Sequence, residues 1–254
     1  LAGWRGWLAA WLCTAPVLVG FVAPVIHLID AALNEAEAIE RFPRLAANSM
    51  LAAGIAALVA LAVALGLAYG RRLQPTRAVK IATRLATLGY GVPGPVLALG
   101  VLVPLAALDN WFDGQMRAFF GVSTGLMLTG SSAALCFAYA VRFLALAYGA
   151  VEAGLERVTP SMDGAARTLG SGPWRVLARV HAPLLRGSVA AALILVFVDC
   201  MKELPMTLLL RPFGFETLAT HVYQYASAEQ LEAGALAALA IVAVGLAPII
   251  LLSR

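Results

Sequence analysis

Six long apolar runs, separated by shorter polar stretches, dominate the hydrophobic pattern of the chain. They cover residues 7–29, 46–70, 85–108, 122–148, 187–210 and 232–252. A helix needs about 20 apolar residues to cross a bilayer, and every run is long enough. None of them shows the short alternating pattern of a membrane β-barrel strand. The pattern therefore predicts an all-α, polytopic membrane protein with six transmembrane helices.

The polar stretches between these runs alternate in charge. The second and fourth stretches and the two chain ends are basic, whereas the other stretches carry mostly acids. The basic residues are Arg5, Arg71, Arg72, Arg77, Lys80, Arg84, Arg157, Arg167, Arg175, Arg179, Arg186 and Arg254, and the acidic ones are Asp30, Glu35, Glu37, Glu40, Asp109, Asp113, Glu216 and Glu229. Because Lys and Arg collect on the cytoplasmic side of membrane proteins, both termini are predicted to be cytoplasmic.

The amino-acid composition agrees with a membrane protein and argues against some classes of partner. The chain is 61% hydrophobic and 13% charged, against about a quarter charged in soluble domains. Its net charge of +4 is spread between apolar runs, so no nucleic-acid partner is predicted. Cys13, Cys136 and Cys200 lie inside apolar runs and are expected to be small core residues. Because the first residue is Leu1 rather than Met, we expect a piece of a longer chain.

Motifs for catalysis or ATP binding are absent from the sequence. Neither lysine follows a glycine, so there is no P-loop. The three histidines fall in separate segments without an HExxH pattern. The chain is therefore not expected to be an enzyme, and no cofactor is predicted. A transporter driven by a partner ATPase and a secondary transporter driven by an ion gradient both remain open.

Two of the spans have unusual interiors. The third contains GYGVPGPVLALG (89–100), whose Gly and Pro residues predict a kink or an unwound turn, either at a pathway or only for packing. The fifth contains Asp199, Lys202 and Glu203, spaced to share one helix face, and Pro205 loosens the backbone beyond them. They predict either a buried ion pair between helices or a polar lining of a translocation path. No firm metal site is predicted; under the pathway alternative, Asp199 and Glu203 are the carboxylates that could briefly meet a hard cation.

Arg142 also falls inside a predicted span. It lies near the inner end of the fourth apolar run, so its long side chain is expected to reach the cytoplasmic interface.

The stretch MDGAARTLGSGPWRVLARVHAP (162–183) predicts a compact helix-turn-helix on the cytoplasmic face. Thr159 and Pro160 suit a helix start, Gly170 suits a left-handed helix end, and Pro183 marks the start of the fifth span. The first helix carries a short stripe of mostly small residues: Met162, Ala165, Ala166 and Leu169. Such a stripe is compatible with a helix resting on lipid headgroups or with a docking site for a cytoplasmic partner.

This stretch resembles the EAA loop of ABC importer permeases. The motif reads Glu-Ala-Ala, three residues, Gly, nine residues, then Ile-x-Leu-Pro, and the spacing fits Gly164, Ala165, Ala166, Gly170 and Pro183. Gly164 stands where the family has Glu, and Asp163 precedes it as a substitute carboxylate. The resemblance implies that residues 157–186, hereafter the coupling segment, dock in a groove of a cytoplasmic ATP-binding subunit.

A wider resemblance covers about residues 40–254. GYGVPGPVLALG (89–100), residues 139–170 and VDCMKELPMTLLLRPFGFETLAT (198–220) are similar to the C-terminal half of ferric-iron permeases. The resemblance implies a type I importer fold in a bacterial inner membrane, with residues 1–40 as a peripheral first span and outer loop and 41–254 as the permease core. It implies a second permease half and a periplasmic binding protein as partners. Thiamine, a phosphonate or an oxyanion is an alternative substrate.

The outer stretch 211–230 holds aromatic residues, Glu216 and His221. It is predicted either to receive a periplasmic binding protein or to form a packed outer helix.

Overall fold

The computed structural model describes residues 3–34, 37–170 and 172–252, and every element in this part of the chain is helical. The elements are α1 (Trp4–Val17), η1 (Leu18–Val22), α2 (Ala23–Asn34), α3 (Glu37–Leu73), α4 (Arg77–Ala86), η2 (Leu88–Gly91), α5 (Gly94–Phe120), α6 (Ser132–Glu156), α7 (Pro160–Thr168), α8 (Pro173–Val176), η3 (Leu177–His181), α9 (Ala182–Met201), α10 (Pro205–Leu210), α11 (Leu218–Ser227) and α12 (Leu231–Leu252).

Six helical stretches in this part of the chain are long and apolar enough to span a membrane, which confirms the predicted fold class. They cover Trp4–Asn34, Glu40–Leu73, Gly94–Phe120, Ser132–Glu156, Trp174–Met201 and Leu231–Pro248. The stretch Trp4–Asn34 combines α1, η1 and α2, and Trp174–Met201 joins α8, η3 and α9.

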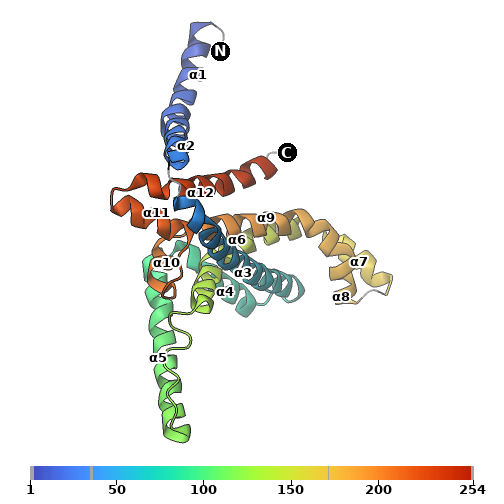
Figure 1. Cartoon of the computed structure of the whole chain (residues 1–254). Coiled ribbons are helices and arrows are strands. Elements are labelled where there is room, and N and C mark those ends of the chain that lie inside the picture. Colours follow the sequence, from blue (N-terminus) through green and yellow to red (C-terminus); the bar gives the residue numbers. More distant parts are fainter. Residues whose placement is uncertain (1–2, 35–36, 171, 253–254) are drawn as a thin grey trace.

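The core is a bundle of α3, α6 and α9, which lie side by side in Figure 1. Small side chains let these helices approach closely, as is usual in membrane bundles. The buried alanines include Ala53, Ala56, Ala60, Ala64, Ala138, Ala147 and Ala192. At Gly154 of α6 an added Cβ would lie 2.4 Å from the Ser188 hydroxyl of α9, so this crossing requires glycine.

Two long elements extend away from this bundle on opposite sides (Figure 1). The stretch Trp4–Asn34 has Ala31 as its one buried residue among those described, and α2 packs against α12. On the other side α5 contacts α6 and α10. Apart from charged residues such as Asp30 and Arg117, the exposed faces of both elements are mostly apolar and are therefore available to lipid or to another protein segment.

The third span begins and ends later than the sequence predicts. Residues 85–93, expected to be part of it, form the end of α4, the 3₁₀ turn η2 and an extended link to Gly94. The glycines and prolines of this stretch break the helix, as expected, but the break precedes the span. Gly89 lies against α6, where an added Cβ would be 2.4 Å from the Val141 carbonyl oxygen.

Asp109 and Asp113 lie on α5 and not in an outer loop as predicted. Their carboxylates accept hydrogen bonds from backbone N–H groups of the segment that follows the helix: Met127, Leu128 and Thr129 for Asp109, and Thr124 and Gly125 for Asp113. The carboxylates thus hold residues 123–129 back along α5. The fourth span consequently begins at Ser132, ten residues later than predicted, and continues to Glu156.

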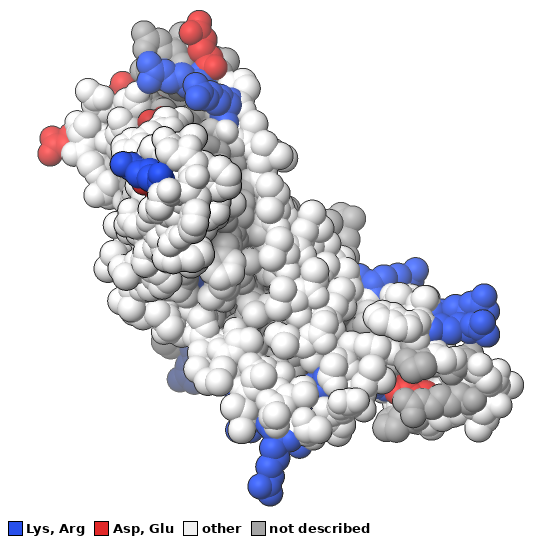
Figure 2. Space-filling model, turned by 90° about the horizontal axis from the view of Figure 1, so that it is seen from below, with Lys and Arg blue, Asp and Glu red and all other residues white. Residues whose placement is uncertain are grey.

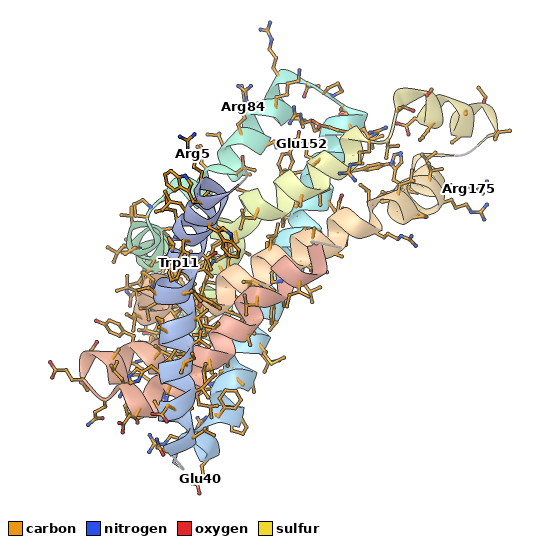
Figure 3. The ribbon with its side chains drawn as sticks, turned by 90° about the horizontal axis from the view of Figure 1, so that it is seen from above. Arg5, Trp11, Glu40, Arg84, Glu152 and Arg175 are labelled. Carbon is orange, nitrogen blue, oxygen red and sulfur yellow. The ribbon has the colours of Figure 1, made fainter. Side chains whose placement is uncertain are left out.

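Charged side chains gather at the two ends of the molecule, and the middle of the face in Figure 2 is almost wholly uncharged. In Figure 3, Arg5, Arg84, Glu152 and Arg175 lie toward one end and Glu40 at the other. Hydrogen bonds fix these ends: Arg72 at the end of α3 donates to Leu155 at the end of α6. At the opposite end Asn48 of α3 donates to the Glu216 carbonyl. The second and fourth, basic stretches of the sequence therefore lie at one end, and Glu40 and Glu216 of the first and fifth, acidic stretches lie at the other.

Candidate coupling and pathway sites

The coupling segment folds as two helices joined by a turn and projects from the basic end (Figure 1). Helix α7 begins at Pro160 and the chain turns at Gly170, whose φ of 76° is left-handed. The second helix differs from the short one predicted, because α8 runs through the π-helical turn η3 directly into α9. A movement of α8 would therefore reach the fifth span without passing a flexible loop.

The motif residues face different ways on α7. Gly164 and Ala165 are exposed, Ala166 and Asp163 are half-buried, and Pro183 is exposed at the start of α9. The side chains of Leu169 and Trp174 are 84% and 78% exposed on either side of the turn. Small residues and two large apolar ones thus form an accessible surface at the tip of the segment, which suits contact with a protein partner.

Asp163 points into the molecule. Its Oδ2 accepts hydrogen bonds from Arg72 Nε at 3.0 Å and lies 2.9 Å from Arg72 Nη2, and its Oδ1 lies 2.7 Å from His181 Nε2. Partial burial raises the pKa of the Asp163 carboxyl, but the hydrogen bonds from His181 and Arg72 together outweigh it and hold that pKa below its usual value. The carboxylate is therefore engaged within the chain, and its substitution for the motif's Glu at an ATPase stays a prediction.

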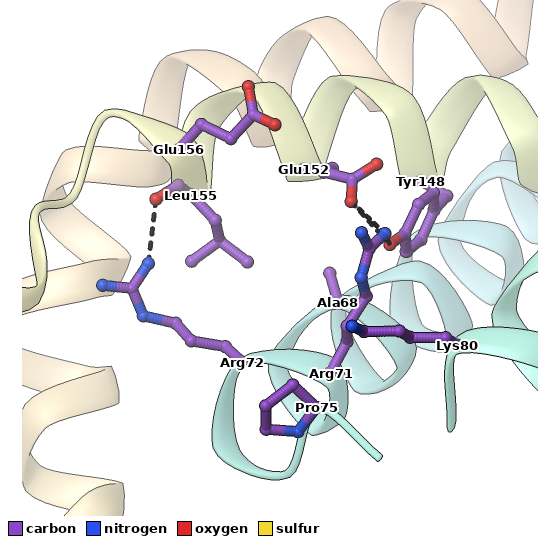
Figure 4. Close-up of a pocket in the computed structure, with 9 residues that line it drawn as sticks. All are labelled: Ala68, Arg71, Arg72, Pro75, Lys80, Tyr148, Glu152, Leu155 and Glu156. Carbon is purple, nitrogen blue, oxygen red and sulfur yellow. Dashed lines mark hydrogen bonds and ion pairs between the residues drawn. The ribbon is translucent and has the colours of Figure 1, made fainter. Parts of the chain in front are cut away.

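A cavity of about 310 Å³ lies near the contact between Arg72 and Asp163, between α3, α4 and α6 (Figure 4). Arg71 forms an ion pair with Glu152 and donates a hydrogen bond to the Tyr148 hydroxyl at 2.9 Å. Tyr148 in turn donates to Glu152 Oε1 at 2.9 Å. The lining of the cavity holds Arg71, Arg72 and Lys80 beside Glu152 and Glu156, so positive and negative side chains face one another across it.

The fifth span is broken where the sequence predicts a continuous helix. Helix α9 ends at Met201, and α10 starts at Pro205. Proline lacks an N–H and clashes with the preceding turn, so it begins a new helix and does not merely loosen the old one. Lys202 and Glu203 therefore lie in the break and not on one helix face with Asp199.

The three predicted pathway charges separate into a pair of an exposed lysine with a half-buried aspartate, and a buried glutamate. Lys202 Nζ lies 2.7 Å from Asp199 Oδ1, and the Lys202 side chain is 59% exposed. The Glu203 side chain is 8% exposed and faces the bundle. The two carboxylates thus have different partners, and no group of three His, Cys, Asp or Glu in the described part of the chain could hold a metal ion.

Glu203 pairs with Arg142, a residue whose role the sequence prediction missed. Arg142 Nε lies 3.6 Å from Glu203 Oε2, and Glu203 Oε1 accepts from the Met206 amide at 3.3 Å. Arg142 is fourteen residues from the C-terminal end of α6 and is held by Glu203, so the prediction that it reaches the cytoplasmic interface is wrong. The sequence prediction missed the Arg142–Glu203 pair because it began and ended the fourth span too early. An arginine inside an apolar run is nevertheless a signal for a buried partner.

Gly94 completes this intramembrane pair, because any side chain there would disturb it. An added Cβ would lie 2.4 Å from Arg142 Nη1 and 3.0 Å from Glu203 Oε1. Thr207 donates to the Glu203 carbonyl oxygen and accepts from the buried Tyr139 hydroxyl. Polar contacts therefore join α6 to α10 at the break, and Gly94 of α5 packs closely against them.

The outer stretch 211–230 forms a packed helix with a polar hollow next to it. Helix α11 begins with a capping box between Thr217 and Thr220 and packs against α12. The hollow, about 530 Å³, is lined by Glu40, Arg41, Arg44, Leu45, Asn48, Gly214 and Glu216. His221 is buried beside Tyr225, so its side chain is not available to a docking protein.

Six helical stretches able to span a membrane and a projecting pair of helices define a polytopic membrane protein. Residues 60–254 match the family described as "binding-protein-dependent transport system inner membrane component". The chain therefore belongs to this family, the permeases of ABC importers.

Three relatives illustrate the range of the family. The Fe(3+)-transport system permease protein FbpB 2 of Haemophilus influenzae is 28% identical over 236 residues, which is 91% of this chain and 44% of the relative. The molybdenum transport system permease protein ModB of the same organism is 32% identical over 45% of this chain and 48% of its own length. A Salmonella typhimurium permease protein named for 2-aminoethylphosphonate transport, PhnV, is 26% identical over 78% of this chain and 69% of its own. The chain thus spans less than half of the iron relative.

Proposed function

We propose that this chain forms the membrane-spanning part of an ABC importer for ferric iron. The observation that supports the importer role best is the coupling segment, which projects from the basic end and runs without a loop into the fifth span. Iron is supported by the similarity to the Haemophilus influenzae Fe(3+) permease, which extends over 91% of the chain.

In this proposal the chain hydrolyses no ATP itself. Cytoplasmic ATPase subunits hold Gly164, Ala165, Ala166 and Gly170 at the tip of the coupling segment. Their closure moves α8 and α9 as one body, which biases the spans between inward-open and outward-open arrangements. A second permease half encloses the pathway, and a periplasmic binding protein delivers iron to the outer end.

The Asp199–Lys202 pair, whose lysine is exposed and whose aspartate is half-buried, is the part of the fifth span that we assign to the pathway. Both groups lie on the surface of this half or close to it, where a second half would enclose them. Glu203 and Pro205 instead maintain the break that presents the pair, through the contact of Glu203 with Arg142. A carboxylate on the path gives a hard cation an oxygen ligand in passing.

The proposal is tested by uptake of radiolabelled ferric iron in cells carrying the complete gene, compared with a strain lacking it, with and without ATP depletion. We expect uptake to need both the gene and ATP. Unchanged iron uptake in the deletion strain would refute the iron assignment. Uptake that persists without ATP would favour an ion-gradient-driven transporter and would refute the coupling role.

Oxyanions and phosphonates are the second candidate substrates, because relatives named for molybdenum and 2-aminoethylphosphonate transport match parts of the chain. The same strains assayed with molybdate and with 2-aminoethylphosphonate separate these candidates from iron. Gene-dependent uptake of either, without iron uptake, would move the assignment to it. Thiamine is assayed in the same way.

A further inference from the structure

We propose that Asp163 is a positioning residue that ties the coupling segment to the spans α3 and α9, and that it makes no contact with the ATPase. This inference rests on the coupling role proposed above. It names the carboxylate through which the coupling segment is attached to the spans.

Both oxygens of Asp163 are held by residues far from it in sequence. Arg72, at the end of α3, approaches Oδ2 with Nε at 3.0 Å and Nη2 at 2.9 Å. His181, the last residue of η3, donates from Nε2 to Oδ1 at 2.7 Å, since an ionised carboxylate only accepts. The carboxylate thus bonds two elements that lead directly into the membrane.

The two partners are themselves fixed. Arg72 also donates to the carbonyl oxygens of Leu155 at 2.9 Å and Val158 at 2.8 Å, at the end of α6. His181 is 2% exposed and meets the Tyr69 ring of α3 edge-on at a centroid distance of 5.7 Å. The ends of α3 and α6 and the start of α9 therefore meet at Asp163, and a displacement of α7 is passed to three spans through charge-assisted bonds.

The neighbouring motif position faces the other way. Gly164 is exposed, and a Cβ added to it would meet nothing within 4 Å. A glutamate side chain at this position would therefore extend into open space, toward a partner, whereas Asp163 is 19% exposed and directed inward. The two positions serve different faces of α7, and a carboxylate at one cannot replace a carboxylate at the other.

The test uses the complete transporter in proteoliposomes and measures substrate transported per ATP hydrolysed. Asp163→Asn keeps the side-chain shape but removes the charge and presents donors to Arg72. We expect this ratio to fall by about fivefold or more while ATP hydrolysis continues. Arg72→Lys, which keeps a positive charge but loses the forked donor geometry, should give the same fall. The matched control Asp30→Asn, on an exposed face of α2, should leave the ratio unchanged.

The double variant Asp163→Asn with Gly164→Glu separates the two roles of a carboxylate here. We expect the introduced glutamate side chain to leave the ratio as low as in Asp163→Asn alone. Restoration of the ratio, or an unchanged ratio in Asp163→Asn, would overturn the proposal, because Asp163 would then substitute for the motif's glutamate or do nothing.

A second readout does not depend on transport. Trypsin cleavage after the exposed Arg175 and Arg179 in the membrane-embedded transporter reports whether the coupling segment is held down. We expect faster cleavage in Asp163→Asn and in Arg72→Lys than in Asp30→Asn. Equal cleavage rates would refute the anchor even where transport is impaired. Absence of ATP-driven uptake in the unaltered transporter, with the cleavage difference intact, would instead count against the proposed function alone.

Discussion

Gly89 lies at a close approach between the link into the third span and helix α6. An added Cβ would lie 2.4 Å from the Val141 carbonyl oxygen, a backbone atom that cannot swing aside. Gly91, in the same short helix, has nothing within 4 Å of such a Cβ. A side chain at Gly89 would therefore clash with α6, whereas a side chain at Gly91 would not, so the second glycine is a control for the first.

We expect Gly89→Ala to lower the free energy of unfolding by about 1–3 kcal/mol, the usual effect of forcing a methyl group into a packed site. Gly91→Ala should leave it unchanged. The measurement is the thermal unfolding midpoint of the protein purified in detergent. Equal midpoints for the two variants would contradict the close approach of η2 to α6.

Gly170 differs from its neighbour Gly172 only in backbone conformation. Neither glycine has an atom within 4 Å of an added Cβ, but Gly170 alone has a left-handed φ, of 76°. An alanine in that conformation costs about 1–2 kcal/mol, which alters the turn at the tip of the coupling segment.

Gly170→Ala is therefore expected to reduce uptake per ATP hydrolysed, and Gly170→Val and Ala166→Glu to reduce it further, without loss of the folded protein. Gly172→Ala is the control and should behave as the unaltered transporter. A normal ratio in Gly170→Val and in Ala166→Glu would exclude the tip of the segment from coupling.

At the scale of elements, the break in the fifth span separates a charge that stabilises the fold from charges that could line a pathway. Glu203 is buried against Arg142, whereas Lys202 is 59% exposed and pairs with Asp199. Removing one partner of a buried pair leaves an uncompensated charge, which typically costs about 3–5 kcal/mol. The Asp199–Lys202 pair has an exposed lysine and a half-buried aspartate, so losing the lysine costs less than losing one partner of the buried pair.

Glu203→Gln should accordingly lower the thermal midpoint clearly, and Lys202→Gln should not. Lys202→Gln should still reduce iron uptake if the Asp199–Lys202 pair lines the path. The two variants are compared for midpoint, expression and uptake in the same cells. Normal uptake in Lys202→Gln at normal expression would remove this pair from the pathway.

The sequence predicts the elements of this fold better than their ends. The apolar runs identify six spans because length and hydropathy are local properties. The ends of the third and fourth spans depend on Asp109 and Asp113, whose backbone contacts draw residues 123–129 along α5. Such contacts have no signature in a local pattern. The same error placed Arg142 near the membrane surface and concealed its pairing with Glu203.

The coupling segment illustrates the same limit at its own site. The turn at Gly170 and the helix start at Pro160 follow from residue type, and both were predicted. The direction of the Asp163 side chain was not, because Arg72 and His181 are 91 and 18 residues away in the chain. A motif read along the sequence gives the spacing of its residues but not the side on which each one faces.

At the scale of the whole molecule, the separation of charges predicts how the chain sits in the membrane. The end of α3 and the coupling segment share the basic end, and Figure 3 places Arg5 toward it, while Glu40 lies at the other end. The positive-inside rule makes the basic end cytoplasmic. The coupling segment then lies where ATP is available.

This orientation is tested by labelling single cysteines with a membrane-impermeant maleimide in spheroplasts. Cys13 is exposed and is replaced by serine, whereas Cys136 and Cys200 are buried and can stay. We expect Gln230→Cys, between α11 and α12, to be labelled in intact spheroplasts. Arg5→Cys and Gln74→Cys should react only after permeabilisation, because their end of the molecule faces the cytoplasm. The reverse pattern would place the coupling segment outside the cell, where no ATPase could use it, and would overturn the importer mechanism together with the orientation.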